Sequence, residues 1–379
     1  MPYITVKQSP KTHQISFEEI IAGEVKLLPF ISHSETNTRT VYVQAVTPQM
    51  VAKINLHAML KSLSAFCQKH AALYDVETHS LYRTFFIPKK SGGMRQINEP
   101  VPELMEALRE LKDILEKEMF AMYHTSAFAY IKGRCTIDCV KKHQKNDSHW
   151  FLKIDFSNFF GNTNMDFVMR MLAQIFPFSE VMRTRQGQEV LRKALQLCFL
   201  DGGLPQGTPI SPMLTNLIMI PIDHRLYNCL RDFNKQGYVY TRYADDIIIS
   251  SRRDFQKEEI IQFVRETLNE FHAPFSLKDE KTRYGSRAGS NWNLGVMLNK
   301  DNEITVGNKN KKYFRAIISN YINDRRNNVK WDLHDVQVMR GHMEYYRMVE
   351  PKYIAEIIKF NNEKYGVDLM ALIKEDLSS

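Results

Sequence analysis

The chain has 379 residues, which is too long for one small domain and suggests two or three. A hydrophobic fraction of 44% and a charged fraction of 25% are ordinary globular values, which exclude disorder and collagen-like repeats. Lys and Arg number 51 against 43 Asp and Glu, and the net charge of +8 permits an anionic partner without requiring one.

The N-terminus lacks the charged-then-apolar pattern of a secretory signal, and no apolar run approaches the roughly 18–20 residues needed to cross a bilayer. The five cysteines are an odd number and contain no CxxC pair. Cys135 and Cys139 are four residues apart, but no second pair stands nearby to complete a zinc site. We therefore expect core thiols in a reducing cytoplasm and no membrane partner.

Residues 1–47 mix polar and β-branched residues without a clear period and receive no assignment. From Pro48 to about Leu73, apolar residues recur near helical spacing. The runs Tyr82–Ile87 and Met94–Ile97 are strand-like and flank a glycine-containing turn, which predicts a hairpin. An amphipathic helix is expected over 103–120.

Trp150–Ile154 is a short apolar strand that ends at Asp155. The segment Leu204–Pro212 contains three prolines and a glycine, which predicts a rigid loop. Ser211 is the expected N-cap of the following helix and Pro212 its first residue, with the helix continuing to about 230.

A second hairpin is predicted over 237–251, with strands at Tyr238–Tyr243 and Ile247–Ser250 and with Ala244–Asp246 at its tip. Beyond about 307 the pattern is helical, with one stripe formed by Tyr313, Ile317 and Tyr321. Further helices are expected near 332–348 and 352–364. Strands interspersed with helices and followed by a helical tail predict an α+β fold with an all-α C-terminal module.

Three aspartates are the candidates for catalysis. Asp245 and Asp246 are adjacent, and two close carboxylates repel each other unless a cation such as Mg²⁺ neutralises them. If the two strands are neighbours, Asp155 and Asp245 could share two metals roughly 3.5–4 Å apart. Such a pair activates a 3′-hydroxyl and stabilises the leaving pyrophosphate. An Asp-Asp pair alone is more often a solvated turn than a metal site, so the order of the motifs decides.

Four segments follow one another in a fixed order: Ile87–Arg95 (IPKKSGGMR), Leu152–Phe160 (LKIDFSNFF), Leu204–Pro212 (LPQGTPISP) and Tyr243–Asp246 (YADD). In this order they resemble the reverse transcriptase family, specifically its bacterial branch of group II intron, retron and defence-associated enzymes, over about residues 80–350. The resemblance implies a right-hand polymerase with fingers, a palm containing an antiparallel sheet, and an α-helical thumb. The implied domains are an N-terminal extension with a helical segment (1–75), fingers (76–150), palm with part of the fingers inserted (151–298) and thumb (299–379).

The resemblance implies that Asp155 and Asp245 bind two Mg²⁺ ions, for which Mn²⁺ can substitute. Asp246 is the second aspartate of the same box, and the backbone carbonyl of Phe156 completes a metal site. Phe160 occupies the position of a bulky gate beneath the sugar of the incoming nucleotide. A ring there clashes with a ribose 2′-hydroxyl and so favours dNTPs, whereas the alternative is a plain core residue.

Further nucleotide contacts are implied in the same way. Gln206 resembles the residue that packs beside the incoming base and sugar. Lys90 and Arg95 resemble the fingers groups that grip the triphosphate. Lys281 matches the lysine that protonates the leaving pyrophosphate, and Lys278 is a competing candidate.

The residues after the palm resemble elements that bind a nucleic-acid duplex. Trp292 and Gly295 belong to a segment similar to the primer-gripping hairpin. Basic residues interleaved with aromatics resemble thumb helices that follow a phosphate backbone, although an ordinary solvated helix face gives the same pattern. These thumb residues are Lys309, Lys311, Lys312, Arg315, Arg325 and Arg326.

Two signatures bear on the branch of the family. Cys139–His143 (CVKKH) stands where retron enzymes have Asn-Ala-x-x-His, and Asn293–Gly295 (NLG) where they have Val-Thr-Gly. Both depart from the retron pattern, and the chain ends at Ser379 without room for a maturase module. The remaining expectation is a compact reverse transcriptase of the "unknown group" type, many of which serve antiphage defence.

The leading hypothesis is therefore an RNA-directed DNA polymerase that copies a partner non-coding RNA into DNA from dNTPs in antiphage defence. A second defence protein or a second copy of the chain is a further candidate partner. Alternatives that stay open are a retron-type reverse transcriptase and template-independent or protein-primed synthesis of repetitive DNA, for which residues 1–47 could supply a priming hydroxyl. A non-catalytic RNA-binding scaffold is disfavoured because all three aspartates are present.

Overall fold

The computed structural model describes residues 4–8, 26–31, 39–46, 56–89, 92–117, 123–232, 237–287 and 294–378. The chain divides into two compact units. Unit 1 contains Met1–Cys135, Leu152–Ile249 and Phe255–Arg283, and unit 2 contains Thr136–Phe151, Ser250–Asp254 and Tyr284–Ser379. The predicted boundaries of fingers, palm and thumb stay predictions.

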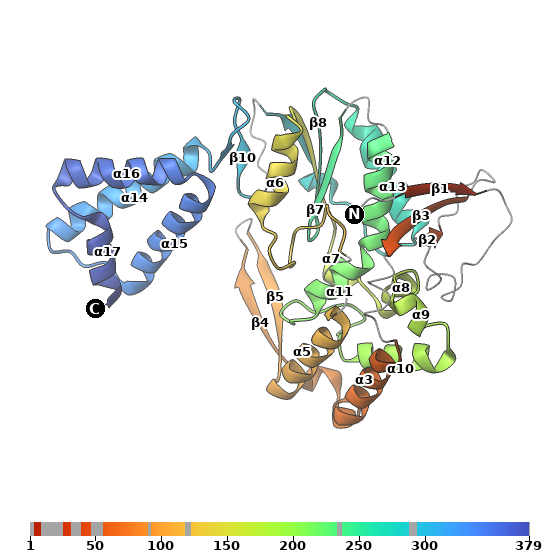
Figure 1. The fold of residues 1–379 in the computed structure, drawn as a ribbon. Coiled ribbons are helices and arrows are strands. Elements are labelled where there is room, and N and C mark those ends of the chain that lie inside the picture. The colour runs from red at the N-terminus through yellow and green to blue at the C-terminus, as the bar shows by residue number, and fades with distance from the viewer. Residues whose placement is uncertain are drawn as a thin grey trace. The chain divides into compact units, whose positions relative to one another are not determined.

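Unit 1 begins with a three-stranded antiparallel sheet in the order β1-β3-β2 (Figure 1). Its strands are β1 (Ile4–Gln8), β2 (Lys26–Ile31) and β3 (Arg39–Val46). No strands were predicted here, because the β-branched residues do not alternate regularly with polar ones.

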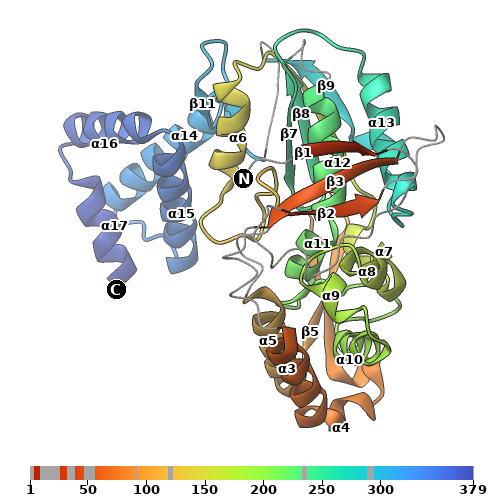
Figure 2. The same ribbon diagram turned by 45° about the vertical axis from the view of Figure 1, so that its right-hand side comes forward.

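The helix predicted from Pro48 to Leu73 is present as α3 (Leu56–Lys69) and α4 (Ala71–Tyr74), while residues 47–55 lie outside the described part of the chain. The 3-10 helix η1 (Thr78–Leu81) follows. The helix predicted over 103–120 is confirmed as α5 (Pro102–Glu116), with proline in its first turn. Helix α3 lies beside α5 and α10 (Figures 1 and 2).

The first predicted hairpin is confirmed. Strand β4 (Tyr82–Pro88) pairs antiparallel with β5 (Met94–Pro100), with Ile87 opposite Arg95. The side chains of both strands are largely exposed, and only the base of β5, at Asn98 and Pro100, is buried.

A four-stranded sheet in the order β7-β8-β6-β9 carries the three candidate aspartates. Its strands are β6 (Trp150–Asp155), β7 (Val239–Tyr243), β8 (Asp246–Ser251) and β9 (Arg283–Ser286). Only two residues connect β7 to β8, which makes this pair the predicted hairpin. Asp246 begins β8 instead of lying at the tip. Because β6 neighbours β8, the condition under which Asp155 and Asp245 could share metals, that their strands are neighbours, is met.

The remaining helices of unit 1 occur between and after these strands. They are α7 (Phe159–Asn162), α8 (Met165–Leu172), α9 (Phe178–Val181), α10 (Arg185–Gln196), α11 (Ser211–Ile218), α12 (Ile220–Asp232), α13 (Lys257–Glu270) and the 3-10 helix η4 (Asp279–Lys281).

The start of α11 differs from the prediction. Ile210 is the N-cap and Ser211 is already helical, because the Ser211 hydroxyl hydrogen-bonds that of Thr208 at 2.6 Å instead of capping the helix. The single helix predicted to about 230 is two helices that part at Met219.

Unit 2 contains α6 (Thr136–Lys145), the short strands β10 (Met297–Leu298) and β11 (Ile304–Thr305), and four C-terminal helices. These are α14 (Asn308–Arg326), α15 (Leu333–Val349), α16 (Pro351–Tyr365) and α17 (Leu369–Ser378). The helices predicted near 332–348 and 352–364 are confirmed, whereas α17 was not predicted.

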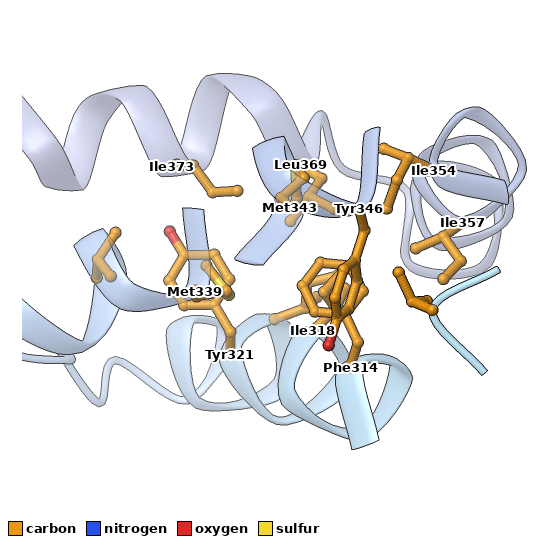
Figure 3. Close-up of a cluster of buried hydrophobic side chains, with 13 residues drawn as sticks. Phe314, Ile318, Tyr321, Met339, Met343, Tyr346, Ile354, Ile357, Leu369 and Ile373 are labelled. Carbon is orange, nitrogen blue, oxygen red and sulfur yellow. The ribbon is translucent and has the colours of Figure 1, made fainter. Parts of the chain in front are cut away.

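The C-terminal helices share one apolar core (Figure 3). On α14 the buried residues are Phe314, Ile318, Tyr321 and Ile322. Tyr313 is 61% exposed, and Ile317 packs against the core while only partly buried. The predicted stripe of Tyr313, Ile317 and Tyr321 is therefore wrong at Tyr313, whose neighbour Phe314 is buried instead. The 3.6-residue period fits both registers, and packing against α15 and α16 selects the one that buries Phe314.

Helices and antiparallel strands occur together along the chain, which confirms the predicted α+β class. Within the described ranges, no helix has the length and apolar character needed to span a membrane.

Replacing Phe314 with Ala should lower the free energy of unfolding by about 3–5 kcal/mol, because it removes a ring that is 1% exposed and packs 5.0 Å from Tyr346. Urea denaturation followed by circular dichroism measures the loss. Tyr313→Ala on the exposed face of the same helix is the matched control and should change stability by no more than about 0.5 kcal/mol. Equal losses for the two variants would contradict the observed register of α14.

Candidate active site

The β7–β8 connection consists of Ala244 and Asp245. Ala244 has φ of 57°, the positive value found at the first central residue of a type II′ hairpin turn. Glycine is favoured there, and an L-residue pays on the order of 1 kcal/mol for this conformation. The turn that carries the catalytic candidates must therefore be held by contacts from its surroundings.

One such contact joins the turn to the end of β6. The backbone N–H of Phe156 donates to the carbonyl of Asp245 at 3.2 Å. The ring of Phe156 is fully buried, with ring centroids 5.4 Å from Phe159 and 5.5 Å from Phe275. The aromatic core thus fixes the backbone that follows Asp155 against the turn, and the two predicted metal-binding segments come together.

Both lysines proposed as proton donors lie beside Asp155. The Lys278 Nζ is 3.2 Å from Oδ1 and the Lys281 Nζ is 3.4 Å from Oδ2. The backbone N–H of Lys278 also donates to the carbonyl of Asp155 at 2.9 Å. The Lys278 side chain is 26% exposed and that of Lys281 is 49% exposed, so Lys278 remains as good a candidate as Lys281.

A third lysine was not predicted. The Lys153 Nζ is 2.9 Å from Asp246 Oδ1, and both side chains are less than one third exposed. Lys153 and Asp155 are two residues apart on β6 and so point to the same face of the sheet. The two-residue period of the predicted strand is the signal from which the position of Lys153 beside the aspartates could have been inferred.

The carboxylates at the turn are buried and repel one another. Burial raises the pKa of Asp245, and the charges of Asp246 and Asp155 raise it further. Burial also raises the pKa of Asp246, while the Lys153 ammonium lowers it. Across the described residues, no group of three or more acidic, His or Cys side chains is already gathered around a common point that suits a metal ion. Lysines are the counter-ions of Asp155 and Asp246 instead.

The predicted sugar gate, Phe160, is partly buried in α7. Its carbonyl accepts the backbone N–H of Leu204 at 3.0 Å. A Cβ on Gly203 would lie 2.0 Å from the carbonyl oxygen of Gly161. The two backbones therefore touch where only glycine fits, and this contact fixes the position of the gate. Gly203 was not predicted, because nothing local marks a contact between segments about 40 residues apart.

Gln206 lies in a loop that is joined to the first hairpin. Its carbonyl accepts the backbone N–H of Asn98 on β5 at 2.8 Å. Gly207 has φ of 116°, and a Cβ there would lie 2.8 Å from the Asn98 carbonyl. Arg95 is exposed on the same strand, whereas Lys90 lies outside the described residues.

The basic residues predicted to bind nucleic acid differ in their surroundings. Lys309, Lys312 and Arg315 are exposed on α14. Lys311 is ion-paired with Glu350, while Arg325 is ion-paired with Glu375 at 2.8 Å and Asp376 at 3.1 Å, and Arg326 lies 5.8 Å above the ring of Tyr365. Gly295 has φ of 89° beside Tyr345, and Trp292 lies outside the described residues. Lys311 and Arg325 thus already serve the packing of the helices.

Asp245→Asn should raise the melting temperature at pH 7 in the presence of a chelator, because it removes a carboxylate whose folded-state pKa is raised. The stabilisation should shrink as the pH falls through the raised folded-state pKa and vanish below 3.8, the ordinary pKa, since the wild-type carboxyl is then protonated in both states. Differential scanning calorimetry across pH measures it. The exposed carboxylate Asp166, whose Asn variant should show no such rise, is the control. If the melting temperature of Asp245→Asn at pH 7 is equal to or below that of the wild type, the Asp245 carboxylate does not destabilise the folded state.

Comparison with protein families matches residues 87–314, well over half of the chain, to the reverse transcriptase (RNA-dependent DNA polymerase) family. The retron Ec83 reverse transcriptase of Escherichia coli is 27% identical over 303 residues, covering 78% of this chain and 90% of that protein. The retron Ec73 reverse transcriptase of Escherichia coli is 25% identical over 290 residues, covering 74% and 85%. Among solved structures, apo telomerase from Candida tropicalis has a TM-score of 0.47 at 14% identity, covering 92% of this chain and 70% of that one.

These relatives support a retron-type enzyme and give no support to the predicted separation from the retron branch. The histidine shared with the retron signature, His143, is fully buried, its Nδ1 lies 2.6 Å from Ser250 Oγ, and burial lowers its pKa to about 3. It is therefore a neutral core residue. With its motifs in order and its aspartate-bearing strands adjacent, the chain belongs to the reverse transcriptase family and is an RNA-directed DNA polymerase.

Proposed function

We propose that this protein copies an RNA template into DNA from dNTPs by nucleotidyl transfer assisted by two divalent cations. The observation that supports it best is the hydrogen bond from the Phe156 N–H to the Asp245 carbonyl, which keeps Asp155 beside the Ala244–Asp245 turn. Lys278 and Lys281 reach the same carboxylate. This arrangement supplies acidic ligands on one side and proton donors on the other.

The donor set fits Mg²⁺. Carboxylate and carbonyl oxygens are the ligands that this cation prefers. Oδ1 of Asp155 is buried and accepts no hydrogen bond from the described residues, although the Lys278 ammonium is 3.2 Å away. The raised pKa values of Asp245 and Asp246 add a second reason, because a bound cation would stabilise the ionised carboxylates against burial and against the charge of Asp155. Asp155, Asp245 and the Phe156 carbonyl would hold the metals, with Asp246 held by Lys153.

Bound cations would supply Lewis-acid stabilisation of the charge that develops on the transferred phosphate. The chain's own residues would do the rest. Lys281 or Lys278 carries a proton at Nζ for the leaving pyrophosphate. Arg95 offers a planar fork to the triphosphate oxygens. Phe160 presents its ring to the sugar and leaves no room for a 2′-hydroxyl.

A template RNA is the partner that this reaction requires, and relatives named as retron reverse transcriptases support it. The resemblance of the motifs to defence-associated enzymes supports antiphage defence as the setting and a non-coding RNA as the template. A cytoplasmic location, inferred from the thiols, completes the proposal, and none of the five cysteines is in a disulfide.

Replacing both Asp245 and Asp246 with Asn should reduce Mg²⁺-dependent dNTP incorporation by about 10³-fold or more, because the metal ligand Asp245 loses its charge and Asp246 loses its ion pair with Lys153. Primer extension on an RNA template measures the rate. Asp166→Asn, an exposed carboxylate on α8, should retain wild-type incorporation. Unchanged incorporation by the double variant would show that the polymerase site lies elsewhere.

Phe160→Ala should raise the incorporation of rNTP relative to dNTP by about 10–100-fold, because it removes the ring that would meet the 2′-hydroxyl. Competition between rATP and dATP at a single template position measures the ratio. Phe159→Leu, which alters the buried neighbour of the gate, should leave the ratio unchanged. An unchanged ratio for Phe160→Ala would make this residue part of the core only.

A further inference from the structure

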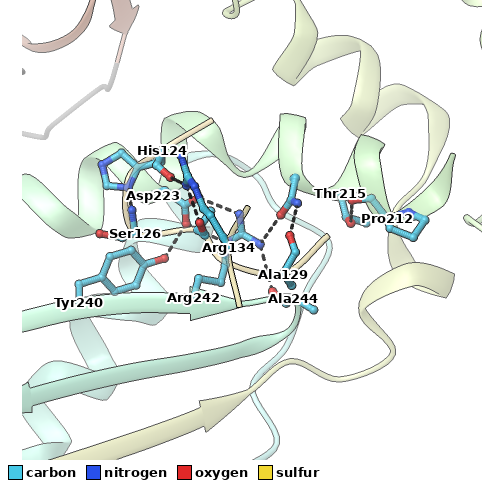
Figure 4. Close-up of polar contacts among 12 residues, drawn as sticks. His124, Ser126, Ala129, Arg134, Pro212, Thr215, Asp223, Tyr240, Arg242 and Ala244 are labelled. Atoms are coloured by element: carbon cyan, nitrogen blue, oxygen red, sulfur yellow. Dashed lines mark hydrogen bonds and ion pairs between the residues drawn. The ribbon is translucent and has the colours of Figure 1, made fainter. Parts of the chain in front are cut away.

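Arg242 on β7 is fully buried although it carries a charge. Its Nε and Nη2 donate to the two carboxylate oxygens of Asp223 on α12, each at 2.8 Å (Figure 4). The Tyr240 hydroxyl donates to the same carboxylate at 2.6 Å. Both members of the Arg242–Asp223 ion pair are completely shielded from solvent. Burying two charges gives little net stability compared with apolar residues of the same volume, so this pair calls for a further reason.

The third nitrogen of the guanidinium supplies that reason. Nη1 of Arg242 donates to the carbonyl of Ala244 at 3.1 Å and to Oδ1 of Asn216 at 3.2 Å. Ala244 is the residue with positive φ in the turn, directly before Asp245. The rigid fork of one side chain therefore connects α12, α11 and the catalytic turn.

The same residue secures the segment 124–131. The backbone N–H of Arg242 donates to the Ser126 carbonyl at 2.7 Å, and its carbonyl accepts from the Phe128 N–H at 3.0 Å. Asn216 in turn donates to the Ala129 carbonyl at 2.7 Å. The next residue, Tyr130, is 54% exposed and has φ of 59°, a strained value for an aromatic residue. Burial raises the pKa of Tyr130, and the charge of Asp245 raises it further, which indicates that its hydroxyl lies in the field of the catalytic turn.

We propose that Arg242 is a positioning residue of the polymerase site: its buried guanidinium holds the Ala244 carbonyl and thereby keeps Asp245 opposite Asp155. The Phe156 N–H holds the next carbonyl of the same turn, so the two carbonyls are fixed from two sides. Arg242 touches no reacting atom. This assignment rests on the proposed function, because it concerns the geometry of that site.

Arg242→Lys is the direct test, since lysine keeps the charge and a contact with Asp223 but cannot also reach Ala244 and Asn216. Single-turnover incorporation of one dNTP should slow by about 10–100-fold, while the apparent Kd for dNTP changes by less than about threefold. Tyr240→Phe is the matched control: it removes the hydroxyl that donates to Asp223 and keeps the hydrogen bonds from Arg242 to Asp223, Asn216 and Ala244. Its melting temperature should fall, and its incorporation rate should stay within about twofold of wild type.

A second substitution separates positioning from stability. Glycine adopts positive φ at no cost, so Ala244→Gly should recover at least about fivefold of the rate lost in Arg242→Lys without restoring its melting temperature. If Arg242→Lys does not fold, Asp223→Asn, which loosens the same guanidinium, provides the same comparison with and without Ala244→Gly.

The outcomes are distinct. No incorporation by the wild-type protein would overturn the proposed function itself. An active wild type with equal rates for Arg242→Lys and Tyr240→Phe would overturn the positioning role alone. Recovery of rate and melting temperature together would likewise assign Arg242 to stability and not to the turn.

Discussion

The repulsion among three carboxylates at the ends of two neighbouring strands is the constraint on which the rest of the site depends. Asp155 ends β6, Asp246 begins β8, and Asp245 lies in the turn before it. Left to themselves, these groups would move apart or take up protons. The chain opposes this by fixing the backbone around them and by placing lysine ammonium groups beside two of them. The fold therefore maintains an electrostatically unfavourable arrangement, as expected of a site that is completed by a ligand.

The backbone contacts that hold this arrangement come from different parts of the chain. Phe156 holds one carbonyl of the turn, and Arg242 holds the other. Around the predicted gate, Gly203 and Gly161 allow two backbones to touch. In each case the functional side chain is positioned by a neighbour with no chemical role of its own. This explains why a list of catalytic candidates accounts for only part of the site.

The sequence predicted what depends on local pattern and on the order of motifs. The α+β class and both hairpins followed from it, whereas the adjacency of the two aspartate-bearing strands was only a condition that the structure meets. The register of α14 did not, because the periodicity of Tyr313 and Ile317 differs from that of Phe314 and Ile318 only in what packs against them. The N-cap of α11 was misassigned because Ser211 bonds to Thr208, a choice that propensity does not reveal.

The polar partners were the least accessible to prediction. Asp223 and Arg242 are 19 residues apart, and Lys278 and Asp155 are separated by more than 120. Such pairs are created by the tertiary fold, so neither composition nor spacing identifies them. The motif did place Arg242 two residues before Ala244, but its burial and its fork could be known only from the structure.

The hydrogen bond from Asn98 to the Gln206 carbonyl limits how the first hairpin can move. The bond anchors the base of β5 to the loop that carries Gln206, and the tight approach of Gly207 prevents sliding at that point. Farther along the hairpin, Phe86 and Met94 are more than half exposed and meet no core. The hairpin is therefore attached at its base, at Asn98, and free of core contacts at Phe86 and Met94. Any closure over a substrate must come from bending of β4 and β5 beyond Asn98, or must move the Gln206 loop together with the hairpin.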